Sequence, residues 1–173
     1  MIEKYEKFLT DFDTKLKSFF ERDFSMIKCK KGCSLCCTNG NYPLSQLEMS
    51  YLMRAFAMLG KEQNEKVKTN IKTLLNKQNL STYTCPFLLN GECSVYSHRP
   101  IICRVHGLAF RRENGVVNLP GCSDFQLNYS EYYDGKMASF EPISEDLTLS
   151  KIIAREKGIK FGVIRTMLDW FRS

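Results

Sequence analysis

The chain has 173 residues, of which 43% are hydrophobic and 25% are charged, and this ordinary composition excludes an intrinsically disordered chain. No run of about 18 apolar residues occurs, which excludes a membrane-spanning helix. The first residues mix both charges without an apolar stretch, so we expect no secretory signal and a cytoplasmic protein. A length of 173 residues predicts a single domain.

Within this single domain (1–173) we expect three parts. They are an N-terminal amphipathic helix (1–28), a cysteine-cluster metal-binding region (29–125) and C-terminal helices (140–173). The N-terminal helix is predicted over residues 3–24, where apolar side chains recur at spacings of three and four. Its polar face carries both Lys and Glu, whereas helices on membrane surfaces are usually basic. We therefore interpret it as a helix packed on the core of its own chain.

Two helices are predicted after the first cysteines. Ser45 and Glu48 have the spacing of a capping box, in which the serine oxygen and the glutamate carboxylate bind free amides at a helix start. The helix that they open is expected to end near Gly60. Apolar residues at helical spacing predict a second helix over residues 61–78.

The helical periodicity disappears between residues 80 and 126. Within this segment, Glu113-Asn114-Gly115 separates two short apolar runs and predicts a hairpin. Helices are then expected to resume near Ser144, as N-cap, and to run to Gly158. A last helix is predicted from apolar residues at 164, 167, 168 and 171. The sequence therefore predicts a helix-rich α+β fold, in which helices flank an irregular cysteine-rich metal-binding centre with a small hairpin.

Cysteine is the most informative residue type in this sequence. Disulfides rarely persist in a reducing cytosol, where clustered cysteines more often bind metal. Four of the eight cysteines fall within nine residues, and the other four are spread through the irregular segment. We predict that all eight ligate metal: Cys29, Cys33, Cys36, Cys37, Cys85, Cys93, Cys103 and Cys122.

The residues alone leave the metal and the division of the ligands open. Thiolates are soft ligands that suit both zinc and iron–sulfur clusters. Four plus four cysteines match two sites of four thiolates each, with the two groups either separate or interleaved. Because adjacent side chains diverge, we predict that Cys36 ligates while Cys37 bridges or serves a second metal. This doublet and the number of thiolates favour an iron–sulfur cluster over zinc.

Basic side chains lie near the cysteines. Arg99 and Arg104 flank Cys103, where a guanidinium group would offset thiolate charge and tune a reduction potential, or would bind loop carbonyls. His106 is a candidate ligand or proton donor, although a structural role is the preferred interpretation. The net charge is +6, and metal-bound thiolates would reduce it, so we expect no nucleic-acid partner. The loop around Cys29 is basic and contains Lys28, Lys30 and Lys31. We interpret it as a solvent-exposed loop, and the alternative is that it binds an acidic partner.

Three motifs in the cysteine-rich region resemble a known family. They are Cys33-x2-Cys36-Cys37, Cys85-Pro86-Phe87-Leu88, and Gly91-x-Cys93-x2-Tyr96-x2-Arg99-Pro100-x2-Cys103-Arg104. Together they resemble the YkgJ-like cysteine-cluster proteins of the CxxCxxCC type, described as a putative zinc- or iron-chelating domain. The resemblance covers roughly residues 29–125 and implies that the cysteines form a metal site. One departure is the gap of three residues, rather than two, between Cys29 and Cys33.

The favoured function is therefore a protein that binds a metal cluster, iron–sulfur or zinc, with a redox or catalytic use. The alternative is a structural-zinc module for protein interaction. A lesser alternative is S-adenosylmethionine-dependent protein modification such as lysine methylation, because the chain also resembles part of the flagellin lysine methylase. The spacing Cys29-x3-Cys33-x2-Cys36 also matches the radical-SAM signature, but the repeated βα units of that fold are absent. We expect a protein or redox partner and no membrane.

Overall fold

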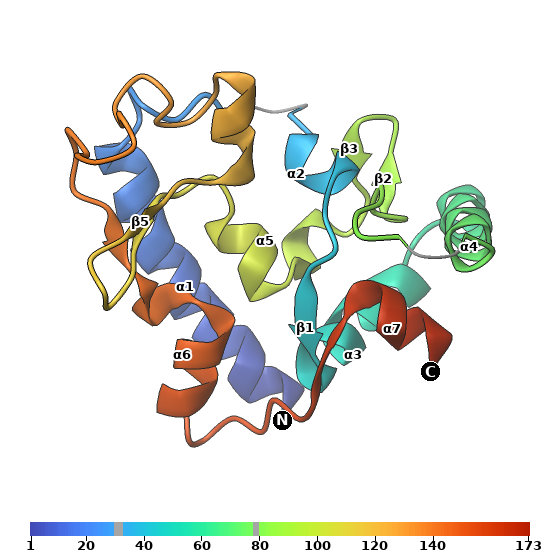
Figure 1. Ribbon diagram of the computed structural model, residues 1–173. Helices are drawn as coiled ribbons and strands as arrows, with labels where there is room; N and C mark the ends of the chain where they lie inside the picture. Colours follow the sequence, from blue (N-terminus) through green and yellow to red (C-terminus); the bar gives the residue numbers. More distant parts are fainter. Residues whose placement is uncertain (30–32, 78–79) are drawn as a thin grey trace. The chain divides into compact units, whose positions relative to one another are not determined.

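The computed structural model describes residues 1–29, 33–77 and 80–173 and divides into two compact units (Figure 1). Unit 1 comprises Met1–Lys31 and Arg104–Ile159, and unit 2 comprises Gly32–Cys103 and Lys160–Ser173. The single domain predicted from the sequence stays a prediction. Within the described ranges, every helix is too short or too polar to cross a lipid bilayer.

Unit 1 is built from one long helix and several short elements. These are α1 (Ile2–Arg22), β4 (Phe110–Arg111), β5 (Val117–Asn118), the 3-10 helix η2 (Gly121–Phe125), β6 (Ile143–Ser144), the 3-10 helix η3 (Glu145–Leu147) and α6 (Leu149–Arg155).

Unit 2 holds the remaining elements. They are α2 (Leu35–Thr38), β1 (Pro43–Ser45), α3 (Gln46–Ala57), α4 (Lys61–Leu75), β2 (Leu88–Leu89), β3 (Glu92–Cys93), the 3-10 helix η1 (Tyr96–His98), the start of α5 (Ile101–Val105), β7 (Ile164–Thr166) and α7 (Met167–Arg172). The helix-rich α+β class predicted from the sequence is confirmed.

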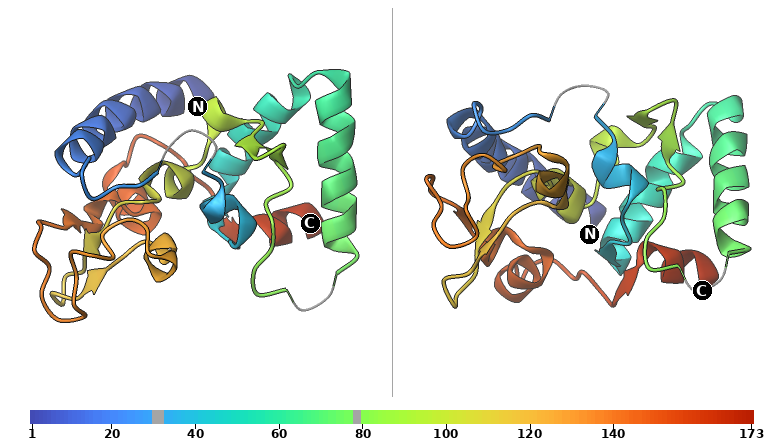
Figure 2. Two further views of the ribbon diagram at one scale, coloured as in Figure 1. Left: turned by 90° about the horizontal axis from the view of Figure 1, so that it is seen from above. Right: turned by 45° about the horizontal axis from the view of Figure 1, so that its top comes forward.

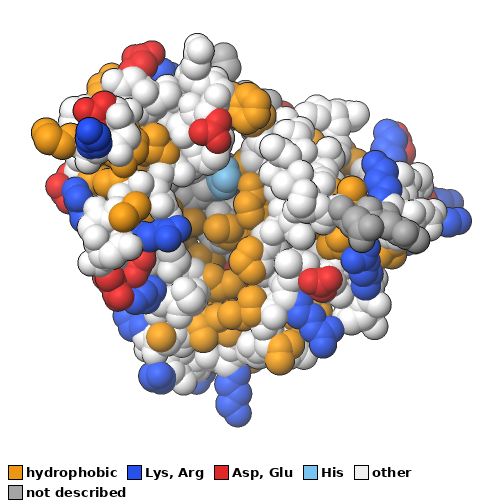
Figure 3. All heavy atoms as spheres, viewed as in Figure 1, with side chains coloured by type: hydrophobic (Ala, Val, Ile, Leu, Met, Phe, Trp, Pro, Cys, Tyr) orange, Lys and Arg blue, Asp and Glu red, His pale blue; other side chains and the backbone are white. Residues whose placement is uncertain are grey.

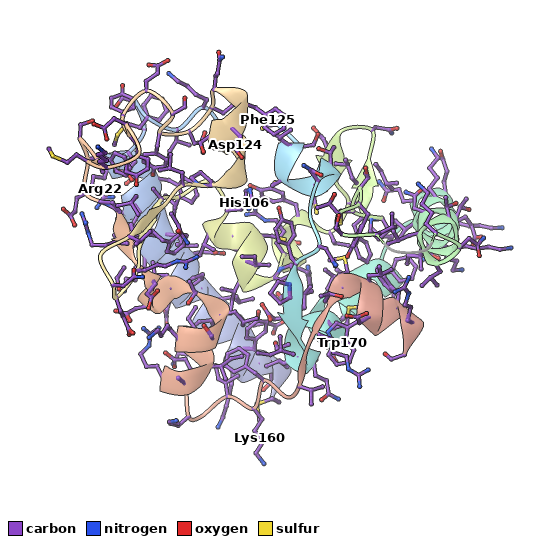
Figure 4. The ribbon with its side chains drawn as sticks, in the orientation of Figure 1. Arg22, His106, Asp124, Phe125, Lys160 and Trp170 are labelled. Atoms are coloured by element: carbon purple, nitrogen blue, oxygen red, sulfur yellow. The ribbon has the colours of Figure 1, made fainter. Side chains whose placement is uncertain are left out.

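Helix α1 in unit 1 confirms the predicted N-terminal helix and buries one apolar face, formed by Tyr5, Leu9, Phe12 and Leu16. At its end, Asp23 is buried and accepts hydrogen bonds from Arg22 and from the Tyr129 hydroxyl, which lies 2.7 Å from Oδ2 (Figure 4). The Arg22 guanidinium also donates to the Glu141 carbonyl oxygen. A buried carboxylate is tolerated because these donors replace its lost water.

The predicted hairpin in unit 1 is confirmed. Strand β4 pairs antiparallel with β5, with Phe110 opposite Asn118, and β6 adds to β4 in parallel. The connecting turn uses Gly115, whose φ of +83° lies in the left-handed region that favours glycine. The Asn114 side chain accepts from the Val116 amide and closes this turn.

Unit 2 has a hydrophobic core that includes Leu44, Leu52, Val67 and Phe87. Strand β1 pairs antiparallel with β7, and α7 packs against α4 (Figure 2). The Trp170 indole nitrogen donates to the Leu44 carbonyl oxygen at 3.0 Å and fixes α7 on β1 (Figure 4). Lysine and glutamate side chains lie together on the outer side of α4 (Figure 3).

The start of α3 confirms the predicted capping box. Ser45 Oγ accepts from the Glu48 amide, and the Glu48 carboxylate accepts from the Ser45 amide. Both residues are buried, which makes this cap an internal part of unit 2 rather than a surface feature.

Two predictions in the C-terminal part were wrong in detail. Ser144 is an N-cap as predicted, but it opens only the short helix η3, because the chain leaves helical geometry at Thr148; α6 then ends at Arg155 rather than at Gly158. Residues 164–166 form β7 rather than the first turn of the last helix, since they pair with β1. Thr166 then caps α7 by accepting from the Asp169 amide.

Candidate metal centre

The eight cysteines predicted as ligands divide between the two units. Six lie in unit 2 and two, Cys29 and Cys122, lie in unit 1. Five of those in unit 2 are half-buried: Cys36, Cys37, Cys85, Cys93 and Cys103. Cys33, the sixth, is exposed.

Cys36 and Cys37 lie on the single turn of α2, with their Sγ atoms 4.0 Å apart. The Cys85 amide donates to the Cys37 carbonyl oxygen at 2.6 Å, which joins this turn to the segment that carries the third thiol. The Tyr42 hydroxyl donates to the Cys36 carbonyl oxygen at 3.0 Å. The Tyr42 ring occupies the position that a Cβ on Gly40 would take, so the loop after α2 requires a glycine there.

A tight hairpin brings Cys93 back towards Cys85. Strands β2 and β3 pair with Leu88 opposite Cys93. The turn between them is Asn90-Gly91, with φ of +52° and +81°, as in the type I′ turns that suit two-residue hairpins. We did not predict this hairpin, although the Asn-Gly dipeptide was a signal that could have revealed it.

Cys103 lies in the first turn of α5, where its amide donates to the Pro100 carbonyl oxygen at 3.0 Å. The first amide of this helix, that of Ile101, donates to Glu48 Oε1 at 2.9 Å. The contact ties the segment with Cys103 to the capping box of α3. Neither this contact nor its role was predicted from the sequence.

The five half-buried thiols affect one another electrostatically. Burial raises the pKa of Cys85 to about 12, and the thiols of Cys93 and Cys36 add to the rise. The pKa of Cys103 is raised by burial and then by Cys85, Cys36 and Cys93. The pKa of Cys37 is raised by its hydrogen bond with Cys36, by burial and by the neighbouring thiols. The chain therefore brings thiols from three separate segments into one electrostatic neighbourhood.

Donors are already directed at these sulfur atoms. Backbone hydrogen bonds from Phe87 and Leu88 lower the pKa of Cys85 and partly offset the effect of burial. A backbone hydrogen bond from Val95 acts in the same direction on Cys93. Amides that donate to sulfur stabilise the thiolate and are a means by which proteins tune metal–thiolate centres.

Arg99 adds positive charge to this neighbourhood. Offsetting thiolate charge was one of the two roles predicted for it, and binding a loop carbonyl was the other. Its charge lowers the pKa of both Cys93 and Cys103, although burial keeps their net shift upward. The guanidinium lies 3.5 Å from the centre of the Tyr96 ring, and its Nε donates to the Tyr96 carbonyl oxygen. The other arginine, Arg104, is buried in unit 1 and pairs with Asp13.

The donor set fits a soft metal. Two thiolates on one tetrahedral ion with metal–sulfur bonds of about 2.3 Å lie about 3.8 Å apart, close to the 4.0 Å between the sulfurs of Cys36 and Cys37. These two thiols can thus bind one metal or two neighbouring metals. Across residues 1–29, 33–77 and 80–173, no three Cys, His, Asp or Glu side chains stand at the spacing of a formed metal site. Metal binding would draw the sulfurs closer together.

In unit 1, Cys29 is held by the fully buried side chain of Asn128. The Asn128 amide nitrogen donates to Cys29 Sγ at 3.2 Å and to the Gly107 carbonyl oxygen at 2.8 Å, while its oxygen accepts from the Lys28 amide. Gly107 has a φ of +101°, and a Cβ there would lie 3.2 Å from Cys29 Sγ. A single asparagine in an irregular segment gives no sequence signal, so this contact could not have been predicted.

The structure gives the positions of the other candidate residues in unit 1 but does not test their predicted roles. Cys122 is buried in η2 and is 5% exposed. His106 is half-buried, and burial lowers its pKa. Lys28 is exposed, whereas Lys30 and Lys31 lie outside the described residues. The structure leaves their roles as ligands or as partner-binding residues as predictions.

Comparison with known proteins gives one match. The model of the CxxCxxCC family, described as a putative zinc- or iron-chelating domain, matches residues 28–126, more than half of the chain. No curated protein and no solved structure matches.

Proposed function

Because the chain belongs to the CxxCxxCC family, described as a putative zinc- or iron-chelating domain, we propose that the half-buried thiols of unit 2 hold an iron–sulfur cluster with a redox or catalytic use. The proposed ligands are drawn from Cys36, Cys37, Cys85, Cys93 and Cys103. Cys33 lies in the same unit and can complete the set.

One observation carries this proposal: unit 2 brings half-buried thiols from three separate segments together. The Sγ atoms of Cys36 and Cys37 lie 4.0 Å apart, and the Cys85 amide donates to the Cys37 carbonyl oxygen. The thiols of Cys36, Cys85 and Cys93 all raise the pKa of Cys103. A single tetrahedral zinc ion takes four ligands. Five neighbouring thiols exceed that number, which favours a centre with more than one metal atom over a single zinc ion. An iron–sulfur cluster is held by thiolates, and this neighbourhood offers them.

When bound, such a cluster would supply one-electron chemistry. The residues of this chain would hold and tune it. The amides of Phe87, Leu88 and Val95 would stabilise the thiolates, and Arg99 would offset part of their negative charge. Positive charge near a cluster favours its reduced state, because that state is the more negative one.

The proposal includes a reducing, cytoplasmic location, since free clustered thiols persist there. It also includes a redox or other protein partner. The exposed thiol of Cys33 shows that the cysteine segment reaches the surface of unit 2, where such a partner could approach.

Metal and sulfide analysis tests the proposal. Protein purified without oxygen is expected to be brown, to contain iron and acid-labile sulfide, and to bleach reversibly on reduction. Serine at Cys85 and Cys103 together should abolish the colour, and Cys122→Ser tests whether a thiol of unit 1 contributes. Colourless protein that holds zinc, and no iron after anaerobic reconstitution, would support the structural-zinc module instead.

A further inference from the structure

Glu48 combines a charged side chain with almost complete burial, since only 1% of its surface is exposed. It is the third residue of α3, and its Oε2 accepts from the Ser45 amide at 2.8 Å and from Ser45 Oγ at 2.7 Å. A capping box requires only this one carboxylate oxygen and works well on a helix surface. The cap alone therefore does not account for the burial of the whole carboxylate.

The second oxygen serves a different part of unit 2. Glu48 Oε1 accepts from the amide of Ile101, 53 residues further along the chain, at 2.9 Å. Ile101 is fully buried and opens α5, and Cys103 is the third residue of that helix. Pro100 has no amide hydrogen, so the amide of Ile101 is the first one that can anchor this turn.

Helix α3 is a fixed support for this contact. Its first two amides, those of Gln46 and Leu47, donate to the carbonyl oxygens of Val163 and Phe161 at 2.8 and 3.0 Å. One turn further on, the Tyr51 ring stacks on His98, with ring centres 4.4 Å apart. The segment that leads into Cys103 is therefore held by α3 at two places.

From this geometry we propose that Glu48 is a positioning residue of the metal centre. Its carboxylate sets the first turn of α5, and with it the Cys103 thiol, relative to the thiols on α2 and on the β2–β3 hairpin. The inference rests on the proposed function, because it assigns to Glu48 a role at that same centre. A carboxylate is suited to the task, since its two oxygens accept from both segments at once without a competing donor.

Three variants separate this role from a general structural one. Glu48→Gln keeps the shape of the side chain but replaces one carboxylate oxygen by an NH₂ group. The glutamine therefore has one accepting oxygen and cannot accept from both the Ser45 and the Ile101 amides. Glu48→Asp keeps a carboxylate at the capping position but is too short to reach both segments. Thr166→Ala is the matched control, because it removes the side-chain cap of a different helix of the same unit, α7, and leaves Ser45, Glu48 and Ile101 unchanged.

The experiment measures the affinity of the metal-free full chain for Zn²⁺ by competition with a chromophoric chelator, and the thiolate charge-transfer absorption of the Co²⁺ form. Glu48→Gln and Glu48→Asp are expected to lose about 10- to 100-fold in Zn²⁺ affinity, as changes beside metal ligands usually do, and to show a weaker Co²⁺ absorption. Thr166→Ala should keep the affinity of the unmodified chain.

Each outcome bears on one claim. If the unmodified chain binds neither ion and takes up no iron, the proposed function fails. If it binds metal and the folded Glu48 variants match Thr166→Ala in affinity and absorption, the inference about Glu48 is overturned while the proposed function stands. If Glu48→Gln does not fold, Glu48→Asp decides the question by the same two readouts.

Discussion

Removal of the metal is expected to lower the melting temperature of unit 2 strongly. The segment from Cys85 to Cys103 has only two-residue strands, a single 3-10 turn and the start of α5, so its thiols rely on a bound metal to hold the loops together. A ligand that binds only the folded state stabilises it by about 4 kcal/mol at 1,000 times its dissociation constant. For a folding unit of roughly 60–100 residues, this corresponds to about 15–30 °C in melting temperature.

Calorimetry of the full chain, metal-loaded and metal-free, combined with Cys85→Ser, measures this coupling. In the metal-free protein the substitution removes only a half-buried thiol and is expected to cost about 1 kcal/mol. In the presence of metal it should abolish most of the stabilisation by metal. Melting temperatures that are the same with and without metal, and that respond equally to Cys85→Ser in both states, would refute the coupling of metal binding to folding.

Four further predictions concern pH (two of them), the Cys36-Cys37 doublet and unit 1. Burial raises the pKa of Cys85 from 9.0 to about 12, so protons compete with metal and the measured metal affinity should fall as the pH is lowered; an affinity independent of pH would contradict this. In the metal-free protein the same raised pKa means that folding stability, followed by melting temperature, is retained below about pH 9 and declines as the pH rises towards about 12. If Cys36 ligates the metal of unit 2 and Cys37 bridges or serves a second metal, Cys36→Ser should remove a metal centre and Cys37→Ser should change the metal content, so wild-type metal counts in both variants would show this assignment to be wrong. Tyr129→Phe removes the hydroxyl that donates to buried Asp23 at 2.7 Å and should lower the free energy of unfolding by about 1.5–3 kcal/mol in urea titrations. It should leave the metal content unchanged, and a loss below about 0.5 kcal/mol would mean that Asp23 does not depend on this donor.

Local signals predicted much of the fold. The apolar spacing of α1 and the capping box at Ser45 and Glu48 gave helices whose observed bounds lie close to the predicted ones. The turn residues around Gly115 gave the hairpin of unit 1. These features depend on neighbours within a few residues, so the sequence pattern and the structure agree.

Features that depend on distant partners could not be predicted in the same way. Ile164 fits the spacing of the last helix, but pairing with β1 makes it part of a strand. The capping-box spacing predicted that Glu48 caps a helix. It did not predict that the second carboxylate oxygen of Glu48 accepts from the Ile101 amide, 53 residues away. The cysteine count indicated a metal centre, but only the fold shows which thiols share one neighbourhood and that Asn128 holds Cys29.

X-ray absorption at the metal edge of the anaerobically prepared 173-residue chain tests the central claim most directly, because it reports the atoms bound to the metal. We expect iron with about four sulfur neighbours each at about 2.3 Å and an iron–iron distance that marks a cluster. Serine at both Cys85 and Cys103 should remove this signal. A first shell dominated by oxygen or nitrogen in the unmodified chain would contradict a thiolate metal centre in unit 2.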